Sequence, residues 1–258
     1  MTVPVQLRLT SKNFHERSGH VLPHDQNALQ YLLDDLFKFT EENLMRINES
    51  KTKVMLFNTS RNIDFPPELI LPNMNNFLDV VERTRLLGLQ ITTDLRWSAH
   101  SKYIIKRANS KLWRLRRMKL LNIDPDIIID FYFKEIRSIC EMACPVFHSG
   151  LTQRQSRDIE MIQKRALKII LGDSYDRYEV ACTLMSAEPL CDRRQSQCLS
   201  FIKKAVRKGL HTNIFKHADK SRVTRSGTNK LIEYTCNTKR FFNSPLVYLS
   251  RIYNEHMS

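Results

Sequence analysis

Apolar and polar positions in the first third of the chain predict short strands, one helix and loops. Over residues 1–10 the apolar residues alternate with polar ones, which predicts a half-buried strand. Residues 27–47 instead place apolar side chains three and four apart, so they predict a helix with one buried stripe. Residues 54–57 are all apolar and predict a short buried strand.

Two further strands are expected shortly before the pattern changes. Residues 78–84 and 86–92 predict these strands, and Gly88 falls inside the second of them. A glycine within a strand often marks a bulge or a close approach of another backbone. Residues 11–26 and 58–77 are polar and contain Gly, Pro and Asn, so they predict loops.

From residue 99 onward the hydrophobic period is helical. Asp124 and Pro125 match the N-cap and first position of one helix, and Thr152 is a plausible N-cap of the next. That next helix is expected to end at Gly172, which suits a position just beyond a helix C-terminus. The expected helices are 99–120, 125–144 (stopped by Pro145), 153–171, 177–186, 189–208 and a short one at about 246–254.

The two patterns together predict an α+β chain. Residues 1–98 are expected to form a small β layer with one helix, and residues 99–258 a mainly α-helical region. With 258 residues, 42% of them hydrophobic, the chain can bury a core as one large domain or two small ones.

Charge divides the chain at the same place. The net charge is +14, but residues 1–98 hold 11 Lys and Arg against 12 Asp and Glu. Residues 99–258 therefore hold the other 30 basic and 15 acidic side chains. Such an asymmetry indicates a polyanionic partner for the second part, above all RNA or DNA. A basic surface that serves only solubility is the alternative.

Targeting and redox signals are few. No secretory signal and no stretch of about 20 apolar residues is present, so the sequence predicts no membrane contact and a nuclear or cytoplasmic setting. The six cysteines include no C-x-x-C pair, and we expect ordinary reduced thiols rather than a zinc site. The oligomeric state is left open by the sequence.

The densest cluster of positive charge lies in the first of the expected long helices. Residues 99–119 contain eight Lys and Arg and no acidic residue. At 100° per residue an apolar stripe forms one side of this helix, and a narrow sector of cations around Trp113 lies opposite. This sector fits contact with a nucleic-acid backbone plus base stacking, whereas a solvated face with Trp113 packed on the next helix is equally consistent. The candidate contacts are Lys102, Lys106, Trp113 and Arg117, flanked by Arg107, Lys111 and Arg114.

Two further basic clusters follow. The 153–171 helix carries Arg157, Lys164, Arg165 and Lys168 opposite its isoleucines, and Arg157, Lys164 and Lys168 are additional candidate contacts. Lys203, Lys204, Arg207 and Lys208 end the 189–208 helix, where positive charge also suits the helix dipole. This last cluster is the least specific of the three.

A set of segments in a fixed order resembles the C-terminal end of reverse transcriptases encoded by non-LTR (LINE-like) retrotransposons. The likeness covers about residues 27–254, and it rests on the shared order because each segment alone is weak. The segments are NESKTKVMLF, LLGLQITTDLRWSAH, a basic helix ending LRRMK, KEIRSICEMACPVFHSGLT, IEMIQKRALKIILGD, the Arg193-Arg194 pair and NSPLVYLSRIYN.

The resemblance implies a role for each part. Asn48, Lys51 and Thr52 match the motif after the catalytic hairpin of the palm, whose lysine lies near the phosphates of the incoming nucleotide, where a cation stabilises developing charge. Lys51 and Lys53 are thus expected to be phosphate-proximal, although a solvated basic turn is the alternative. The stretch around Gly88 resembles the primer-grip hairpin. The helices from 99 onward resemble the thumb, which holds a template–primer duplex by its backbone.

The residues for nucleotidyl transfer are missing. The complete RNA-directed DNA polymerase uses Mg²⁺ held by aspartates, which activates the primer hydroxyl and stabilises the leaving oxygen. Residues 1–26 contain only Glu16 and Asp25 as acids, and no aromatic-x-Asp-Asp occurs there. The adjacent pair Asp34-Asp35 lies within an expected helix, which cannot present both carboxylates as a hairpin does. The resemblance therefore implies a truncated mobile-element fragment that binds nucleic acid and has no catalytic residue, no metal ligand, no cofactor and no enzyme activity of its own.

Other interpretations fit the same sequence. The chain could be part of an active polymerase, a stand-alone RNA- or DNA-binding module, or a degenerate fragment without function. An upstream reading frame that encodes the missing Asp pair would single out the first. Residues 80–120 also resemble a stretch named after an alkylated-nucleic-acid repair dioxygenase family, whose iron triad begins with His-x-Asp. The one such triplet, His217-Ala218-Asp219, lies in a basic segment without surrounding strands.

Overall fold

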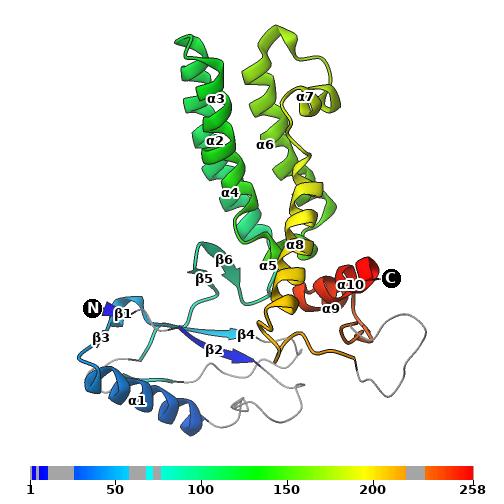
Figure 1. The fold of residues 1–258 in the computed structure, drawn as a ribbon. Helices are drawn as coiled ribbons and strands as arrows, with labels where there is room; N and C mark the ends of the chain where they lie inside the picture. The colour runs from blue at the N-terminus through cyan, green and yellow to red at the C-terminus, as the bar shows by residue number, and fades with distance from the viewer. Residues whose placement is uncertain are drawn as a thin grey trace. The chain divides into compact units, whose positions relative to one another are not determined.

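The described chain forms two compact units. The computed structural model of the protein describes residues 2–3, 6–10, 26–57, 68–71, 77–218 and 230–257. They divide into Met1–Arg96 and Trp97–Ser258 (Figure 1). The first unit holds small sheets and one helix and the second is mainly helical, which confirms the α+β class expected from the sequence.

Short parallel strand pairs and one helix make up the first unit. β1 (Thr2–Val3) pairs with β3 (Arg46–Ile47), and β2 (Gln6–Thr10) pairs with β4 (Lys53–Phe57). Val54 of β4 also forms a parallel bridge with Val80. The core beneath α1 (Gln26–Glu42) consists of Leu33, Val54, Leu69, Leu71 and Leu78, with Phe37 and Ile47 packed against it.

The helix expected to reach residue 47 ends earlier. α1 stops at Glu42, and the Asn43 side-chain amide donates to the Phe39 carbonyl at 2.8 Å. Leu44 then has a φ of 54°, a left-handed conformation that no continuing helix adopts. The chain thus turns at Leu44 and returns along β3, so that the residues thought to end the helix form a strand instead.

The predicted hairpin forms with different bounds. β5 (Arg83–Leu86) pairs antiparallel with β6 (Leu89–Thr92), with Leu86 opposite Leu89. Leu87 and Gly88 form the turn between them, with φ values of 47° and 89°. Two-residue hairpin turns with positive φ at both positions match the strand twist. The placement of Gly88 inside a strand was therefore wrong, because Gly88 supplies the turn.

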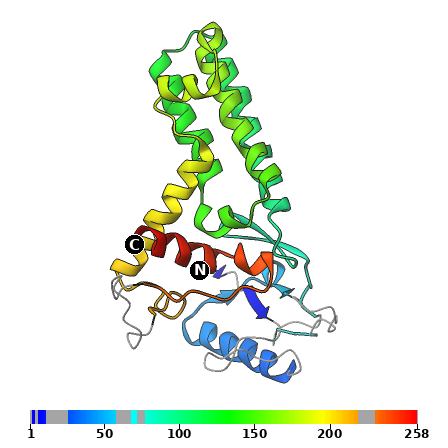
Figure 2. The same ribbon diagram turned by 90° about the vertical axis from the view of Figure 1, so that its right-hand side faces the viewer.

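A bundle of helices builds the second unit. α2 runs beside α6 along most of its length, and α10 lies against α8 (Figure 1 and Figure 2). No helix among the described residues is both long enough and apolar enough to traverse a bilayer. The α-helices are α2 (Ser98–Leu120), α3 (Pro125–Phe131), α4 (Ser138–Glu141), α5 (Cys144–Phe147), α6 (Gln153–Leu171), α7 (Tyr178–Leu184), α8 (Leu190–Arg207), α9 (Lys239–Phe242) and α10 (Pro245–Met257).

The expected helix caps are confirmed. The Asp124 side chain accepts from the backbone N–H of Asp126, and Pro125 occupies the first turn of α3. Thr152 and Gln155 form a reciprocal capping box at the start of α6. Gly172 follows α6 with a φ of 57°. These boundaries were predictable because each depends on neighbours within a few residues.

The helix expected over 125–144 differs from the prediction in two ways. A π-helical segment, Tyr132–Arg137, interrupts it, and the following α4 ends at Glu141. Ala143 has a φ of 57°, which breaks the helix before Pro145 is reached. Pro145 lies in the first turn of α5, where its missing N–H leaves no hydrogen bond unmade. Pro145 therefore does not stop the helix, contrary to the expectation.

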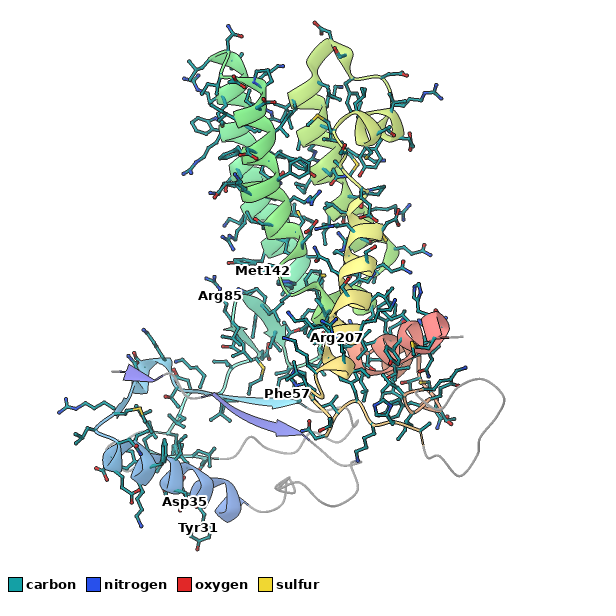
Figure 3. The ribbon with its side chains drawn as sticks, in the orientation of Figure 1. Tyr31, Asp35, Phe57, Arg85, Met142 and Arg207 are labelled. Atoms are coloured by element: carbon teal, nitrogen blue, oxygen red, sulfur yellow. The ribbon has the colours of Figure 1, made fainter. Side chains whose placement is uncertain are left out.

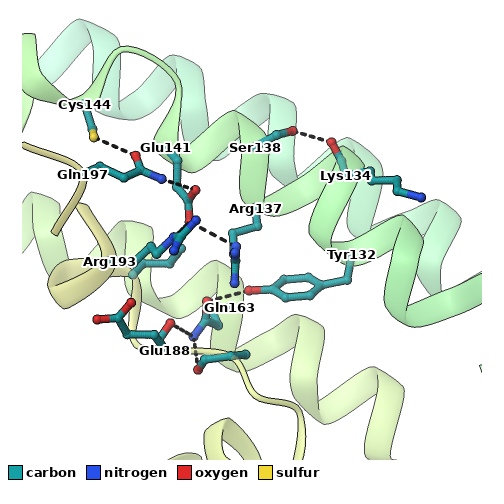
Figure 4. Close-up of polar contacts among 12 residues, drawn as sticks. Tyr132, Lys134, Arg137, Ser138, Glu141, Cys144, Gln163, Glu188, Arg193 and Gln197 are labelled. Atoms are coloured by element: carbon teal, nitrogen blue, oxygen red, sulfur yellow. Dashed lines mark hydrogen bonds and ion pairs between the residues drawn. The ribbon is translucent and has the colours of Figure 1, made fainter. Parts of the chain in front are cut away.

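Buried polar groups fix α8 against α6. Gln163 is fully buried, accepts from the Tyr132 hydroxyl at 2.5 Å and donates to the Glu188 carbonyl at 3.1 Å (Figure 4). The Glu160 carboxylate accepts from the backbone N–H groups of Leu190 at 2.8 Å and Cys191 at 3.0 Å. Because these are first-turn N–H groups of α8, Glu160 supplies the cap that the helix lacks locally.

The two residues of the Arg193-Arg194 pair are both held by contacts within the unit. Arg193 and Arg137 both form ion pairs with Glu141, at 3.5 and 3.1 Å (Figure 4). Arg194 is fully buried and donates to His148 Nδ1 at 3.4 Å and to Ser156 Oγ at 3.1 Å. Arg194 therefore stabilises the interior of the bundle, while the half-exposed Arg193 is paired with Glu141.

Two histidines, the buried His100 and the half-buried His148, give the second unit a pH-dependent stability. His100 is 1% exposed, beside the rings of Trp97 and Phe147, and burial lowers its pKa to about 4. Burial, with the nearby Arg194 charge, likewise lowers the pKa of His148 to about 4. An unfolded histidine has a pKa of about 6.5, so the unfolded state binds more protons between these pH values.

We expect the second unit to be stable above pH 7 and to lose stability as the pH falls from about 6.5 towards 4. The loss from His100 alone is on the order of 2 kcal/mol at pH 5. Thermal melts between pH 7.5 and pH 5 measure it, and His100→Gln should reduce the difference, while His256→Gln at an exposed site should not. A melting temperature that is equally high at both pH values would contradict the prediction.

Candidate nucleic-acid interface

The strongest candidate surface is the side of α2 that faces away from the bundle. Ile104, Ala108, Leu112 and Leu115 are buried on the inner side of the helix. We call the opposite side the α2 outer face, and all its side chains are exposed. None of its three cations forms an ion pair with another described residue. The α2 outer face consists of Lys102, Lys106, Trp113 and Arg117.

Trp113 is exposed rather than packed. Its side chain is 63% exposed, so the alternative in which it packs on the next helix is wrong. The other tryptophan, Trp97, is half-buried, and its ring packs near those of Phe147 and His100. A large exposed aromatic ring among cations can stack on an unpaired base while the cations contact phosphates.

The flanking cations are partly compensated within the molecule. Lys111 forms an ion pair with Glu135 at 2.5 Å, and Arg114 and Arg107 also lie close enough to affect that carboxylate. The hydrogen bond and charge of Lys111, then the charges of Arg114 and Arg107, lower the pKa of Glu135. Arg107 also lies over the Tyr103 ring at 5.6 Å. The structure thus separates Arg107, Lys111 and Arg114 from the uncompensated α2 outer face.

The second predicted cluster lies on the neighbouring helix. Arg157 and Lys168 are exposed on α6, while the Lys164 ammonium lies 4.7 Å from the centroid of the Tyr178 ring. Arg165 Nη1 donates to Asn109 Oδ1 of α2 at 3.2 Å, and both of these residues are exposed. This bond links Arg165 of the second cluster to α2, beside the α2 outer face.

Side-chain positions extend this surface beyond the predicted residues. Arg116 on α2 and Arg154 on α6 are exposed cations that were not among the candidates. Arg116 belongs to the acid-free run of residues 99–119, and this was the signal that could have identified it. The exposed Asp158 makes the α6 side less positive than α2. The third cluster, at the end of α8, is exposed too, and Figure 3 labels its Arg207.

The KTK segment of the first unit, residues 51–53, belongs to a turn that side-chain hydrogen bonds hold in place. Asn48 Oδ1 accepts from the Lys51 backbone N–H at 3.0 Å, and its carbonyl accepts from the Thr52 hydroxyl at 2.8 Å. Thr52 is 1% exposed, and Lys53 forms an ion pair with Asp79. Asn48 and Thr52 therefore fix the turn, and Lys51 is exposed at its surface. Of the two predicted phosphate-proximal lysines, only Lys53 has a carboxylate partner among the described residues.

The structure gives no support to a metal site at either Asp34-Asp35 or His217-Ala218-Asp219. Asp34 and Asp35 lie on α1, where Asp34 accepts from the Gln30 amide at 2.8 Å and Asp35 is exposed near Tyr31 (Figure 3). His217 forms a β-bridge with Leu231, and Asp219 lies outside the described residues.

Comparison with protein-family models, with curated proteins and with solved structures finds no match to this chain.

Proposed function

We propose that the chain binds RNA or DNA along α2 and α6, in the manner of the thumb-like region of a non-LTR reverse transcriptase, without transferring nucleotides. The observation that carries this proposal is the α2 outer face, in which uncompensated cations surround an exposed tryptophan. A merely solvated face does not require an exposed tryptophan, which costs favourable burial.

The link to α6 extends the same proposal. Arg165 of α6 bonds Asn109 of α2, so it is the α6 cation best placed to share a ligand with the α2 outer face. Lys102 to Arg117 spans fifteen residues of helix, or roughly 22 Å at 1.5 Å per residue. A template–primer duplex of RNA, DNA or both is the partner we propose, held by its phosphates. From the same resemblance we propose that Lys51, exposed on the KTK turn, contacts a phosphate.

Binding itself is the first test of this function. The affinity of the purified chain for a blunt duplex, measured by fluorescence anisotropy over a salt series, should fall steeply as salt rises. Each neutralised phosphate contributes about −0.7 to −0.9 to the slope of log K against log salt concentration. Absence of measurable binding at low salt would contradict the proposed function.

Replacing Trp113 should separate stacking from charge. We expect Trp113→Ala to weaken the binding of a single strand by about 5- to 150-fold, from a stacking energy of about 1–3 kcal/mol, without changing the salt slope. Duplex binding should change less, because paired bases cannot stack on the ring. Since Trp113 is largely exposed, the melting temperature should stay within a few degrees. A large loss of helicity and melting temperature would show that Trp113 is a core residue.

A further inference from the structure

A groove lined by both apolar and polar side chains lies at the C-terminal end of the second unit and includes no residue of α2. It has a volume of about 480 Å³, within the range of about 300–1,000 Å³ that is typical of ligand sites. One side is formed by residues 230–236, and the other by α9 and the buried side of α10. Asn254 of α10 holds the first side in place, because its amide bonds the Leu231 backbone N–H at 2.9 Å and carbonyl at 3.0 Å.

An exposed phenylalanine lines this groove. Phe242 is 45% exposed, and the Arg251 guanidinium lies 4.2 Å from its ring centroid. The neighbouring Phe241 instead packs edge-on against Tyr234, at 6.1 Å between centroids. One aromatic ring of the pair is therefore used for packing, and the other is partly exposed with a planar cation over one of its faces.

The charges of the groove balance, but its surroundings are basic. Among the lining residues Lys230 and Arg251 are offset by Glu233 and Glu255, and Arg251 approaches Glu255 at 3.9 Å. Lys239 and Arg240, both exposed, precede the two phenylalanines directly in α9. A ligand that matches this pattern has a flat, uncharged, hydrogen-bonding part for the groove and an anionic part for the cations outside it.

Hydrogen-bonding groups are also present on the groove lining. The hydroxyl of Ser250 is buried and has no hydrogen-bond partner among the described residues. The Glu233 carboxylate accepts from the Asn254 amide at 3.3 Å and keeps further acceptor capacity. Such groups can bond the edge of a base while an aromatic ring or a guanidinium stacks on its plane.

We propose that this groove binds an unpaired nucleobase of a single-stranded RNA or DNA segment, stacked on the face of Phe242 that Arg251 does not cover, with the adjoining phosphates on Lys239 and Arg240. This inference rests on the proposed function and adds a second contact point to it. The ligand bound by the whole second unit is then a duplex with a single-stranded extension, rather than a blunt duplex.

Phe242→Leu tests the groove directly. The probe is a duplex with a single-stranded extension that carries 2-aminopurine, whose fluorescence is quenched when the base stacks. Phe242→Leu keeps apolar volume but removes the π face, so quenching should disappear and affinity should fall about 5- to 150-fold. Phe242→Tyr should retain both the quenching and the affinity, because it keeps the π face. Phe201→Leu is the matched control, because Phe201 is 38% exposed on α8 and does not line the groove.

The blunt duplex distinguishes this inference from the proposed function. The Phe242→Leu variant should bind the blunt duplex with the same affinity as wild type. An unchanged melting temperature shows that the variant is folded. If the extended duplex binds Phe242→Leu as tightly as wild type, while the blunt duplex still binds with a steep salt slope, the groove assignment is wrong and the proposed function stands. If neither duplex binds wild type, both are wrong.

Discussion

Changing Lys102, Lys106 and Arg117 together to alanine is expected to make the slope of log K against log salt concentration shallower by roughly 2–3 units. Each of these exposed side chains should neutralise one phosphate when nucleic acid binds. Each neutralised phosphate releases about 0.7–0.9 of a counterion, so every lost contact makes the slope shallower by that amount. The loss of affinity should be similar for every sequence, because phosphates carry no sequence information. Anisotropy measurements over a salt series give both quantities.

A charge-matched variant controls for net charge. Lys203, Lys204 and Arg207 are exposed at the end of α8, and replacing all three by alanine removes the same charge. If the α2 outer face carries the contact, this control should change the slope by much less than the α2 variant. A smaller effect from the α2 variant than from the α8 variant would place the ligand elsewhere, since the two differ only in position.

The purified chain is expected to leave a primer unextended on RNA or DNA templates, with either magnesium or manganese present. Transfer requires carboxylates that hold two metal ions about the reacting phosphate. The only adjacent Asp pair of the sequence lies on α1, where successive side chains diverge by 100° around the helix. Gel analysis of a labelled primer measures the extension directly.

Contaminating polymerase is the main source of a misleading signal in that assay. Asp34→Asn combined with Asp35→Asn should leave any trace of extension unchanged, because neither residue is a metal ligand in this account. Template-dependent extension that co-purifies with the chain and disappears in the double variant would contradict it. It would also show that α1 rearranges, since the helix holds Asp34 against Gln30.

The parts of the fold that could be predicted are those set by local sequence. The apolar spacing located α1, α2, α6 and α8, and capping residues placed the start of α6 and its end at Gly172. The errors arose where a boundary depends on backbone conformation that many residues can adopt. Leu44, Leu87 and Ala143 all take positive φ without being glycine, so nothing in their chemistry announces a turn.

The candidate site was predictable to a similar extent. Helical geometry correctly placed the α2 outer face opposite the buried stripe, because this requires only the period of one helix. The compensation of Lys111 by Glu135, the caps that Glu160 provides and the Arg165–Asn109 bond join residues far apart in the chain. No local pattern indicates which helices will be neighbours, and so these contacts needed the structure.

Photo-crosslinking tests the central claim, that nucleic acid lies along the α2 outer face, most directly. A single-stranded oligonucleotide that carries 5-iodouracil would be irradiated with the whole chain, and the crosslinked residue would be found by tryptic mass spectrometry. The account predicts a crosslink at Trp113, which is absent in Trp113→Ala and reduced in the Lys102, Lys106 and Arg117 triple variant. Crosslinks confined to the end of α8 or to the first unit, with none on α2 or α6, would contradict it.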